Sequence, residues 1–222
     1  MVGAVAVVRP MLQSVADPQR APQMAAYMKG IAPFLGVSTP ARRQATRAWI
    51  RAFDPGPAAG DLLGAAGQLV AAPEREFSYV AIDLVRRHER RLPHDSLGAL
   101  RDLALVRPWW DTVDAWATLV GRVGLLHRDW DRQVAAWAAD PQLWARRIAL
   151  VFQVGRGTQV DLDLLFAACE ATMADPDFFM RKGIGWGLRD AARSHPEQVR
   201  AFVEAHRDGL APLSVREATK HL

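Results

Sequence analysis

The stretch Pro73–Leu92, PEREFSYVAIDLVRRHERRL, contains the pattern on which the fold depends. Its apolar residues recur every three or four positions, at Phe77, Val80, Ala81, Leu84 and Val85. This spacing is that of one face of an α-helix, with arginines on the opposite face. The chain has no sustained period-two alternation, so strands are not expected. We therefore predict an all-α fold of about a dozen helices joined by short turns.

The aromatic residue near the start of this helix recurs along the chain. It is found at Phe77, Trp110, Trp144 and Phe179, at intervals of 33, 34 and 35 residues. A further step of 34 residues toward the N-terminus reaches Arg43, in another stretch of helical pattern. A period in the thirties with paired helices is typical of α-solenoids, in which each pair stacks on its neighbours. We predict one domain of HEAT-like helical repeats over residues 1–222, with a concave basic groove lined by the starts of these helices.

Several helix starts carry a capping residue followed by proline. Ser38 or Thr39 precedes Pro40, and this predicts a helix that begins there. The Asp-Pro pairs at 140 and 175 precede two further helical stretches. We predict that each aspartate caps its helix and that the proline after it occupies the first helical position.

The bulk composition narrows the class of protein. No run of about 18 apolar residues is present, so no membrane span is expected. The single cysteine, Cys169, excludes an intramolecular disulfide and a cysteine-built zinc site, and it fits a reducing compartment. The histidines are scattered without metal-ligand spacing, and no glycine-rich phosphate loop is present. We expect a cytoplasmic monomer, associated with the nucleoid in a bacterium, that needs no metal or cofactor.

The basic residues are almost all arginine. The formal net charge is only +4, but the sequence isoelectric point is about 9.8. Lysine occurs only at 29, 182 and 220, so 25 of the 28 basic residues are arginine. The planar guanidinium suits phosphate, which favours a polyanion-binding surface. Codon bias in a GC-rich genome is an equally good explanation of the composition alone.

The helix starts also carry a carboxylate and two tryptophans among cations. Asp114 lies four residues after its opening aromatic and Arg147 three residues after the next one, so an ion pair between adjacent repeats is expected. A purely structural pair is an open alternative, and tryptophans at helical spacing are most often core residues. Asp111 sits in a first helical turn, where a carboxylate complements the helix dipole without any function. The predicted phosphate-binding cations are Arg43, Arg47, Arg147, Lys182, Arg189, Arg216 and Lys220.

Several motifs together resemble a known family. The segments WWDTVD, RRIALVFQ, KGIGWGLRDAAR and APLSVREATKHL, with AAYMKG and FLGVSTPARRQ near the start, are similar to the DNA alkylation repair family of HEAT-like-repeat DNA glycosylases (AlkD-like). The resemblance implies excision of alkylated purines, such as 3-methyladenine and 7-methylguanine, from double-stranded DNA. It implies that Asp114 is the catalytic aspartate, supported by Arg147, with Trp110 and Trp186 beside it and Tyr27 near the lesion. Ser38 departs from the family pattern, which has a longer polar residue there.

These residue types suit cleavage of a bond to a cationic base. Tryptophan faces attract cations, and a carboxylate stabilises the positive charge that develops on the sugar. We expect a monofunctional enzyme, because Lys182 is the one lysine expected near the site and a phosphate-binding role suits it better than a Schiff base. Two alternatives stay open: a non-catalytic protein that binds damaged or branched DNA, and a protein-binding HEAT scaffold.

Overall fold

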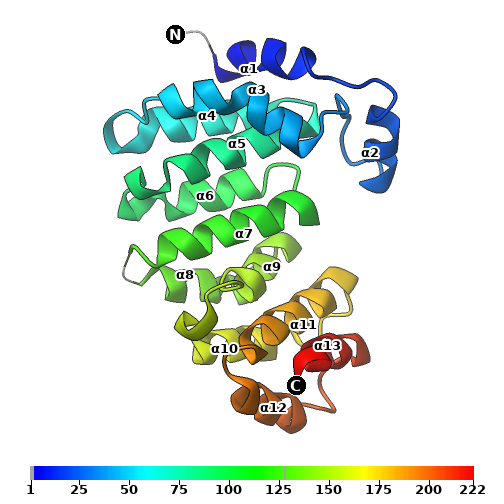
Figure 1. Cartoon of the computed structure of the whole chain (residues 1–222). Helices are drawn as coiled ribbons and strands as arrows, with labels where there is room; N and C mark the ends of the chain where they lie inside the picture. The colour runs from blue at the N-terminus through cyan, green and yellow to red at the C-terminus, as the bar shows by residue number, and fades with distance from the viewer. Residues whose placement is uncertain (1–2, 128) are drawn as a thin grey trace. The chain divides into compact units, whose positions relative to one another are not determined.

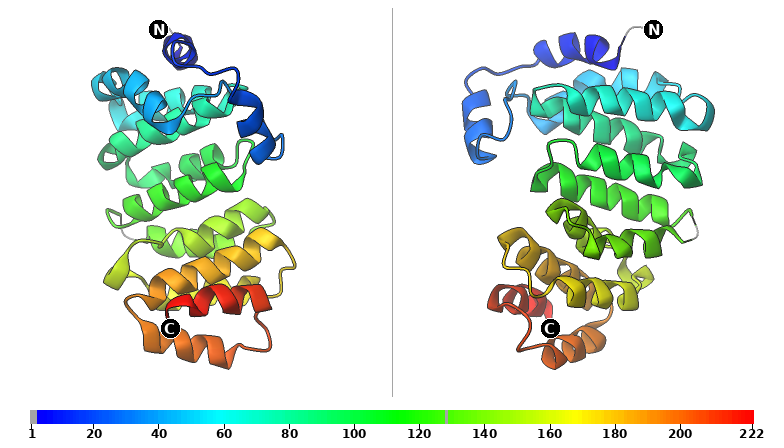
Figure 2. Two further views of the ribbon diagram at one scale, coloured as in Figure 1. Left: turned by 45° about the vertical axis from the view of Figure 1, so that its right-hand side comes forward. Right: turned by 180° about the vertical axis from the view of Figure 1, so that it is seen from behind.

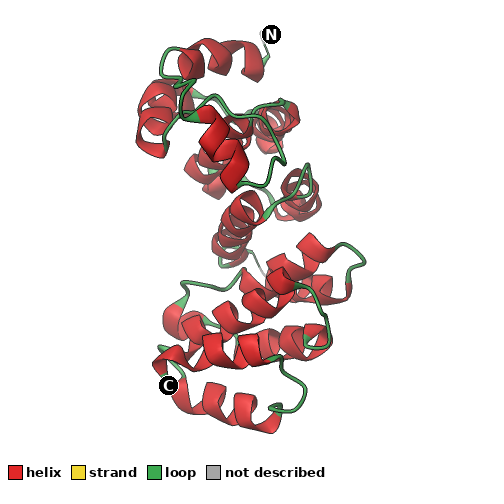
Figure 3. Ribbon diagram, turned by 90° about the vertical axis from the view of Figure 1, so that its right-hand side faces the viewer, coloured by secondary structure: helices red, strands yellow, loops and turns green. Residues whose placement is uncertain are grey.

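The computed structural model describes residues 3–127 and 129–222, which form only helices, turns and loops (Figures 1 and 3). The all-α prediction is confirmed for these residues. The chain divides into two compact units, Met1–Thr112 and Val113–Leu222, and the boundary falls within the first turn of helix α7 (Trp110–Gly124). The prediction of one domain over residues 1–222 stays a prediction. None of the helices in the described ranges combines the length and the apolar character that crossing a bilayer requires.

The first unit is a stack of helices connected by short turns and 3₁₀ segments. Ser38 caps α3, since its Oγ accepts a hydrogen bond from the Ala41 N–H at 3.4 Å, and Pro40 is the second residue of the helix, one position later than predicted. Helices α4 and α5 form an antiparallel pair (Figures 1 and 2). The elements are α1 (Ala4–Gln13), α2 (Ala21–Tyr27), α3 (Thr39–Ala52), η1 (Pro57–Ala59), α4 (Gly60–Ala71), α5 (Arg75–Arg87), η2 (Glu89–Arg91), η3 (His94–Ser96) and α6 (Leu97–Ala104).

The apolar stripe of α5 is the centre of the core of this unit. All of its five predicted members are fully buried: Phe77, Val80, Ala81, Leu84 and Val85. Helices α3 and α4 pack against this stripe, and α1 packs on both of them. Removing such side chains from water supplies about 1.5–3 kcal/mol for each large one. The stripe therefore fixes the orientation of α5 and of the residues at both of its ends.

The second unit repeats the same construction. Two glycines allow helices to approach closely: a Cβ on Gly121 would lie 1.7 Å from the carbonyl oxygen of Phe152, and one on Gly187 would lie 2.7 Å from that of Leu150. Helix α11 contacts α9 on one side and α13 on another. The elements that follow α7 are α8 (Trp130–Ala136), η4 (Trp137–Ala139), α9 (Leu143–Val151), η5 (Gly157–Gln159), α10 (Leu162–Thr172), α11 (Phe178–Ala192), α12 (Pro196–Ala205), α13 (Pro212–Ala218) and η6 (Thr219–His221).

The helix starts follow the predicted repeat. Helices α5, α7, α9 and α11 begin at residues 75, 110, 143 and 178, so successive starts are 35, 33 and 35 residues apart. The four aromatic residues that define the period in the sequence all fall within the first three residues of these helices. The period in the thirties is therefore confirmed as a structural repeat.

The Asp-Pro pairs do not cap their helices, contrary to the prediction. Helices α9 and α11 begin three residues after Asp140 and Asp175. Each aspartate instead accepts a hydrogen bond from the backbone N–H two residues on, Asp140 from Gln142 at 2.8 Å and Asp175 from Asp177 at 2.9 Å. This Asx turn consumes the side-chain acceptor before the helix begins. The capping residue of α11 is Asp177, whose Oδ1 accepts from the N–H groups of the first turn.

Candidate functional site

The second unit contains the Asp114–Arg147 ion pair that the repeat register predicts. Arg147 Nε donates to Asp114 Oδ1 at 2.7 Å, and Nη2 donates to Oδ2 at 2.8 Å. This two-point arrangement fixes the plane of the carboxylate relative to the guanidinium. The Arg147 side chain is only 6% exposed, whereas that of Asp114 is 18% exposed. The carboxylate is therefore held from the protein side and keeps an edge that solvent reaches.

The guanidinium of Arg147 joins this pair to α11. Its Nη1 donates to the Phe179 carbonyl oxygen at 2.6 Å, and its central carbon lies 5.9 Å from the ring centroid of Trp186 and 6.0 Å from that of Phe179. These are cation–π distances. The half-buried Trp186 therefore lies beside the Asp114–Arg147 pair. The family resemblance implies this position for Trp186.

The glycines around Trp186 serve helix packing. A Cβ on Gly185 would lie 2.5 Å from Cβ of Glu217 on α13, and Gly187 faces α9. These two glycines therefore permit close helix contacts and do not expose the Trp186 ring. In a helix, the residues on either side of position 186 point away from it by about 100°, so their size affects the packing of other helix faces and not the exposure of the ring. The ring is half-buried.

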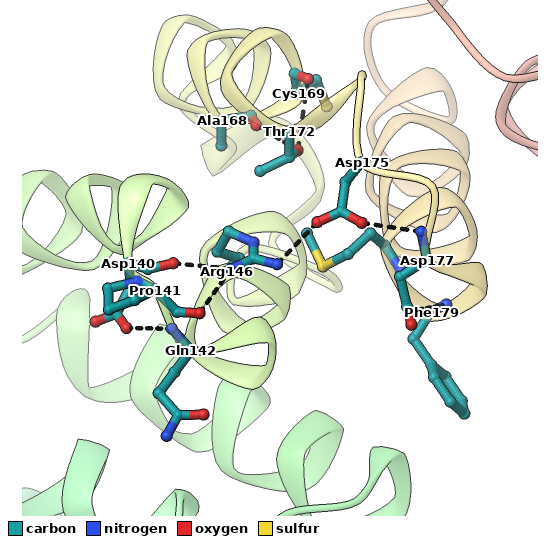
Figure 4. A network of polar contacts seen from close by, with 11 residues as sticks. Asp140, Pro141, Gln142, Arg146, Ala168, Cys169, Thr172, Asp175, Asp177 and Phe179 are labelled. Carbon is teal, nitrogen blue, oxygen red and sulfur yellow. Dashed lines mark hydrogen bonds and ion pairs between the residues drawn. The ribbon is translucent and has the colours of Figure 1, made fainter.

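A second arginine fixes the starts of α9 and α11 (Figure 4). Arg146 Nη1 donates to the carbonyl oxygen of Asp140 at 2.9 Å, and Nη2 donates to Asp175 Oδ2 at 2.8 Å. The other oxygen of Asp175 accepts from the N–H of Asp177, which in turn caps α11 (Figure 4). The loops before the two helices are thus tied together. Because Arg147 and Trp186 lie on these helices, the network helps to set their separation.

The first unit contains a related but more enclosed network at Asp111. Arg75, which has no exposed surface, donates to Asp111 Oδ1 at 2.6 Å and to Oδ2 at 3.0 Å. The Tyr79 hydroxyl donates to the same carboxylate at 2.6 Å. Burial raises the pKa of Tyr79 above its ordinary value, and the adjacent charge of Asp111 raises it further. Asp111 is therefore a structural acid that binds α5 to the start of α7, a stronger role than complementing the helix dipole.

Two predicted site residues, Tyr27 and Trp110, lie together in the first unit. The Tyr27 side chain is 69% exposed, and its ring meets that of Trp110 edge-on, with centroids 6.3 Å apart. Trp110 is the first residue of α7 and precedes Asp114 by four residues, which is one helical turn. The five residues to which the resemblance assigns the chemistry thus form two groups, Tyr27 with Trp110 and Asp114 with Arg147 and Trp186.

Most of the predicted phosphate-binding cations have acidic partners. In the first unit, Arg43 lies 3.6 Å from Asp83, and Arg47 is exposed. In the second unit, one buried acid, Glu217, pairs with three of the predicted cations and Arg216 is exposed beside it. The three pairs are Lys182 at 3.0 Å, Arg189 at 2.6 Å and Lys220 at 2.8 Å.

Glu217 is the site residue that sequence reasoning missed. Hydrogen bonds from Lys220 and Lys182 lower the pKa of its carboxyl to about 2, so it is ionised at neutral pH. The cluster therefore carries a net charge of two rather than three. The Lys220 pair follows the i, i+3 rule and was visible in the sequence, but the two partners on α11 depend on how α13 packs. No group of three or more histidine, cysteine, aspartate or glutamate side chains suited to a metal occurs in residues 3–127 and 129–222.

Comparisons with known proteins agree with this construction. The sequence model described as "DNA alkylation repair enzyme" matches residues 8–222. A solved structure described as a "Predicted DNA alkylation repair enzyme from Enterococcus faecalis" has 29% sequence identity and a TM-score of 0.86, over 93% of this chain and 96% of that chain. No curated sequence is significantly similar.

The fold defines an α-solenoid of paired helices in the class of helical-repeat DNA repair proteins, as the sequence predicts. The chain belongs to the DNA alkylation repair enzyme family. The family description implies an enzymatic role and a DNA substrate. The predicted roles of the individual site residues stay predictions, as does the concave basic groove that they would line together.

Proposed function

We propose that the protein is a monofunctional DNA glycosylase that hydrolyses the N-glycosidic bond of cationic alkylpurines in duplex DNA. The observation that best supports this proposal is the Asp114 carboxylate, which Arg147 holds on both oxygens beside Trp186. A surface that only bound phosphate would gain nothing from an acid at this position. A carboxylate held in a fixed orientation suits a reaction in which positive charge develops on a sugar.

The chemistry follows from the charge of the substrate. Alkylation at N3 or N7 leaves the purine positively charged, so the electron pair of the broken C1′–N bond neutralises the base as it leaves. No protein acid is then needed to protonate the leaving group. The developing oxocarbenium ion is stabilised by the carboxylate of Asp114, which can also orient water toward C1′. Water supplies the hydroxyl group at C1′ and releases a proton to solvent.

The aromatic residues would contribute through their faces. A tryptophan ring attracts a cation by about 0.5–2 kcal/mol, depending on how far the cation is desolvated. Trp186 lies next to the Asp114–Arg147 pair, and Trp110 lies one turn before Asp114 on α7. In this proposal both rings favour the cationic lesion and the oxocarbenium ion, and Tyr27 contacts the DNA near the lesion.

A second function is favoured by one feature of the same pair. Arg147 neutralises Asp114, and a neutral pair can be purely structural. The alternative is therefore a non-catalytic protein that binds damaged or branched DNA through its cations. It predicts DNA affinity without release of any base.

One experiment separates these functions. The purified protein is incubated with a duplex that contains a single 7-methylguanine, and free base and abasic sites are both measured. The proposal predicts equal amounts of the two products and an intact DNA backbone. Binding to the duplex with no free base would favour the non-catalytic alternative, and strand cleavage would contradict a monofunctional enzyme.

A further inference from the structure

Four arginines form a basic surface that the candidate site does not use. Arg86 and Arg87 end helix α5, and Arg90 and Arg91 lie in the 3₁₀ helix η2 that follows. All four are exposed. We call these four residues the basic edge.

Most other arginines of the first unit pair with a carboxylate, whereas the four arginines of the basic edge do not pair with one within the described residues. Within residues 3–127 and 129–222, no carboxylate forms an ion pair with any of the four. By contrast, Arg42 and Arg43 share Asp83, and Arg75 pairs with Asp111. The four arginines lie within six residues that contain one acid, Glu89, so this segment keeps an excess of positive charge that an external anion would offset.

The basic edge stands on a rigid base. Leu84 and Val85, in the last turn of α5, are fully buried, and Leu92 after η2 is also buried. Between them, His88 Nε2 lies 2.9 Å from the carbonyl oxygen of Ile50 at the end of α3. The backbone that carries the four arginines is therefore fixed on both sides, and a ligand need not order it on binding.

The basic edge is far from the Asp111 network that leads to the candidate site. Arg75 and Asp111 lie at the N-terminal end of α5, whereas the basic edge lies at its C-terminal end, in Figure 1 at the opposite side of the unit. The 13 residues of α5 span roughly 18 Å at 1.5 Å per residue. Complementing the helix dipole would explain one or two cations in the last turn, but it does not explain the pair that follows the helix.

We propose that the basic edge binds the phosphate backbone of a second duplex segment, separate from the one at the candidate site. Arginine-rich runs of this length suit nucleic-acid backbones, because each planar guanidinium can donate two parallel hydrogen bonds to one phosphate. DNA is the polyanion that the family description implies this protein meets. Contact with a second segment would hold the protein on DNA while the candidate site searches for lesions. The proposal rests on DNA binding by the family and does not require glycosylase activity.

The test compares two variants of equal charge. In the first, Arg86, Arg87, Arg90 and Arg91 are all changed to Gln. In the second, four exposed arginines of the second unit outside the candidate site are changed to Gln: Arg132, Arg193, Arg200 and Arg207. Each full-length protein is loaded onto an immobilised duplex, and retention of a second, fluorescent duplex is measured at low salt.

We expect the wild type and the second variant to retain the second duplex. The basic-edge variant should retain at least tenfold less. The slope of log affinity against log salt for the second duplex should fall by about three to four units in that variant, since each lost phosphate contact removes about 0.9. Release of 7-methylguanine from a short duplex should stay unchanged in all three proteins, so failure of this proposal is distinguishable from failure of the proposed function.

Three outcomes would overturn the proposal. Wild-type protein could retain no second duplex, or the two variants could lose retention equally, which would show a dependence on net charge alone. The third outcome uses a fluorescent polyglutamate peptide in place of the second duplex. If the peptide is retained through the four arginines and the duplex is not, the basic edge binds an acidic polypeptide instead. If the basic-edge variant is unstable, the double variant Arg90→Gln, Arg91→Gln, outside α5, should halve the change in slope.

Discussion

Two aspartates three residues apart on α7 form the same kind of ion pair in two different settings. Asp111 is 6% exposed and pairs with Arg75, which is completely buried, while Tyr79 donates a further hydrogen bond to it. Asp114 is 18% exposed and pairs with Arg147, which is 6% exposed. The first carboxylate is enclosed by its own unit, and the second, which Arg147 holds, keeps more of its surface exposed to solvent.

The difference shows how one helix can carry a structural acid and a candidate catalytic acid. An enclosed pair contributes to stability only through its internal geometry, and removal of one partner leaves a buried charge. A pair with an open edge costs less to break and leaves its carboxylate accessible to a substrate. The comparison therefore predicts a division of effects: mutations at Asp111 should change stability, and mutations at Asp114 should change activity.

The largest effect is expected for Asp111→Asn. The variant leaves the guanidinium of Arg75 buried without a counter-charge, which typically costs about 3–5 kcal/mol. Urea denaturation followed by circular dichroism should show a loss of unfolding free energy in this range. Asp114→Asn is the matched control. It should lose clearly less unfolding free energy, because water reaches the Asp114–Arg147 ion pair. Equal losses would remove the distinction between the two settings.

Next in size is the effect of Asp114→Asn on catalysis. Removal of the charge should slow release of 7-methylguanine by tenfold or more, which corresponds to about 1.4 kcal/mol of transition-state stabilisation, while DNA binding is kept or improved. The control is Asp131→Asn, which breaks another two-point pair of the second unit, with Arg156 at 2.5 and 2.9 Å. The control should release base at the wild-type rate. A wild-type rate in Asp114→Asn itself would show that both aspartates are structural.

A smaller change is expected for Trp186→Leu, which keeps much of the apolar area but removes the π face. Base release should fall by about two- to thirtyfold, in line with a cation–π energy of about 0.5–2 kcal/mol. The melting temperature should stay near that of the wild type. Trp137→Leu, at another half-buried tryptophan of the second unit, should leave the rate unchanged. A large loss of stability in Trp186→Leu would identify that ring as a core residue.

The smallest effect is expected at Glu217, where the question is whether an acid helps cations to bind phosphate. Glu217→Gln removes one negative charge, so a purely electrostatic surface would bind DNA more tightly. We expect the opposite, a two- to threefold weaker affinity, since Lys182, Arg189 and Lys220 lose their common anchor. Glu204→Gln changes the charge equally at a 62% exposed side chain and serves as the control. Fluorescence anisotropy on undamaged duplex would measure both.

Glu217 also predicts a dependence of stability on pH. The folded-state pKa of Glu217, about 2, lies below the ordinary pKa of a glutamate. The stability that the ionised carboxyl contributes is therefore fully present when the pH is above this ordinary pKa, and it is lost as the pH falls toward 2. The unfolding free energy of the wild type should therefore decrease over this range more steeply than that of Glu217→Gln. Parallel curves for the two proteins would show that the carboxyl is not stabilised by its cations.

The local pattern of the sequence was sufficient for the helices and for one pair in the candidate site. The apolar stripe of α5 is buried as its spacing predicts, because a stripe at helical period has one stable solution, burial against a neighbour. The repeat period set the register of Asp114 and Arg147 in adjacent repeats, and the ion pair between them follows from that register. The prediction that the Asp-Pro pairs cap their helices was wrong, because an Asx turn and a helix cap use the same residue types.

The sequence by itself thus determined the all-α repeat and the family, and it predicted which residues carry the chemistry. Tertiary structure alone decided which charged side chains pair with one another and which do not. Arg75 closes on Asp111, and Glu217 gathers three cations from α11 and η6, whereas the four arginines at residues 86–91 have no acidic partner within the described residues. The physical reason is that helices form from local spacing, while a charge pairs across helices only where packing brings a partner within about 4 Å.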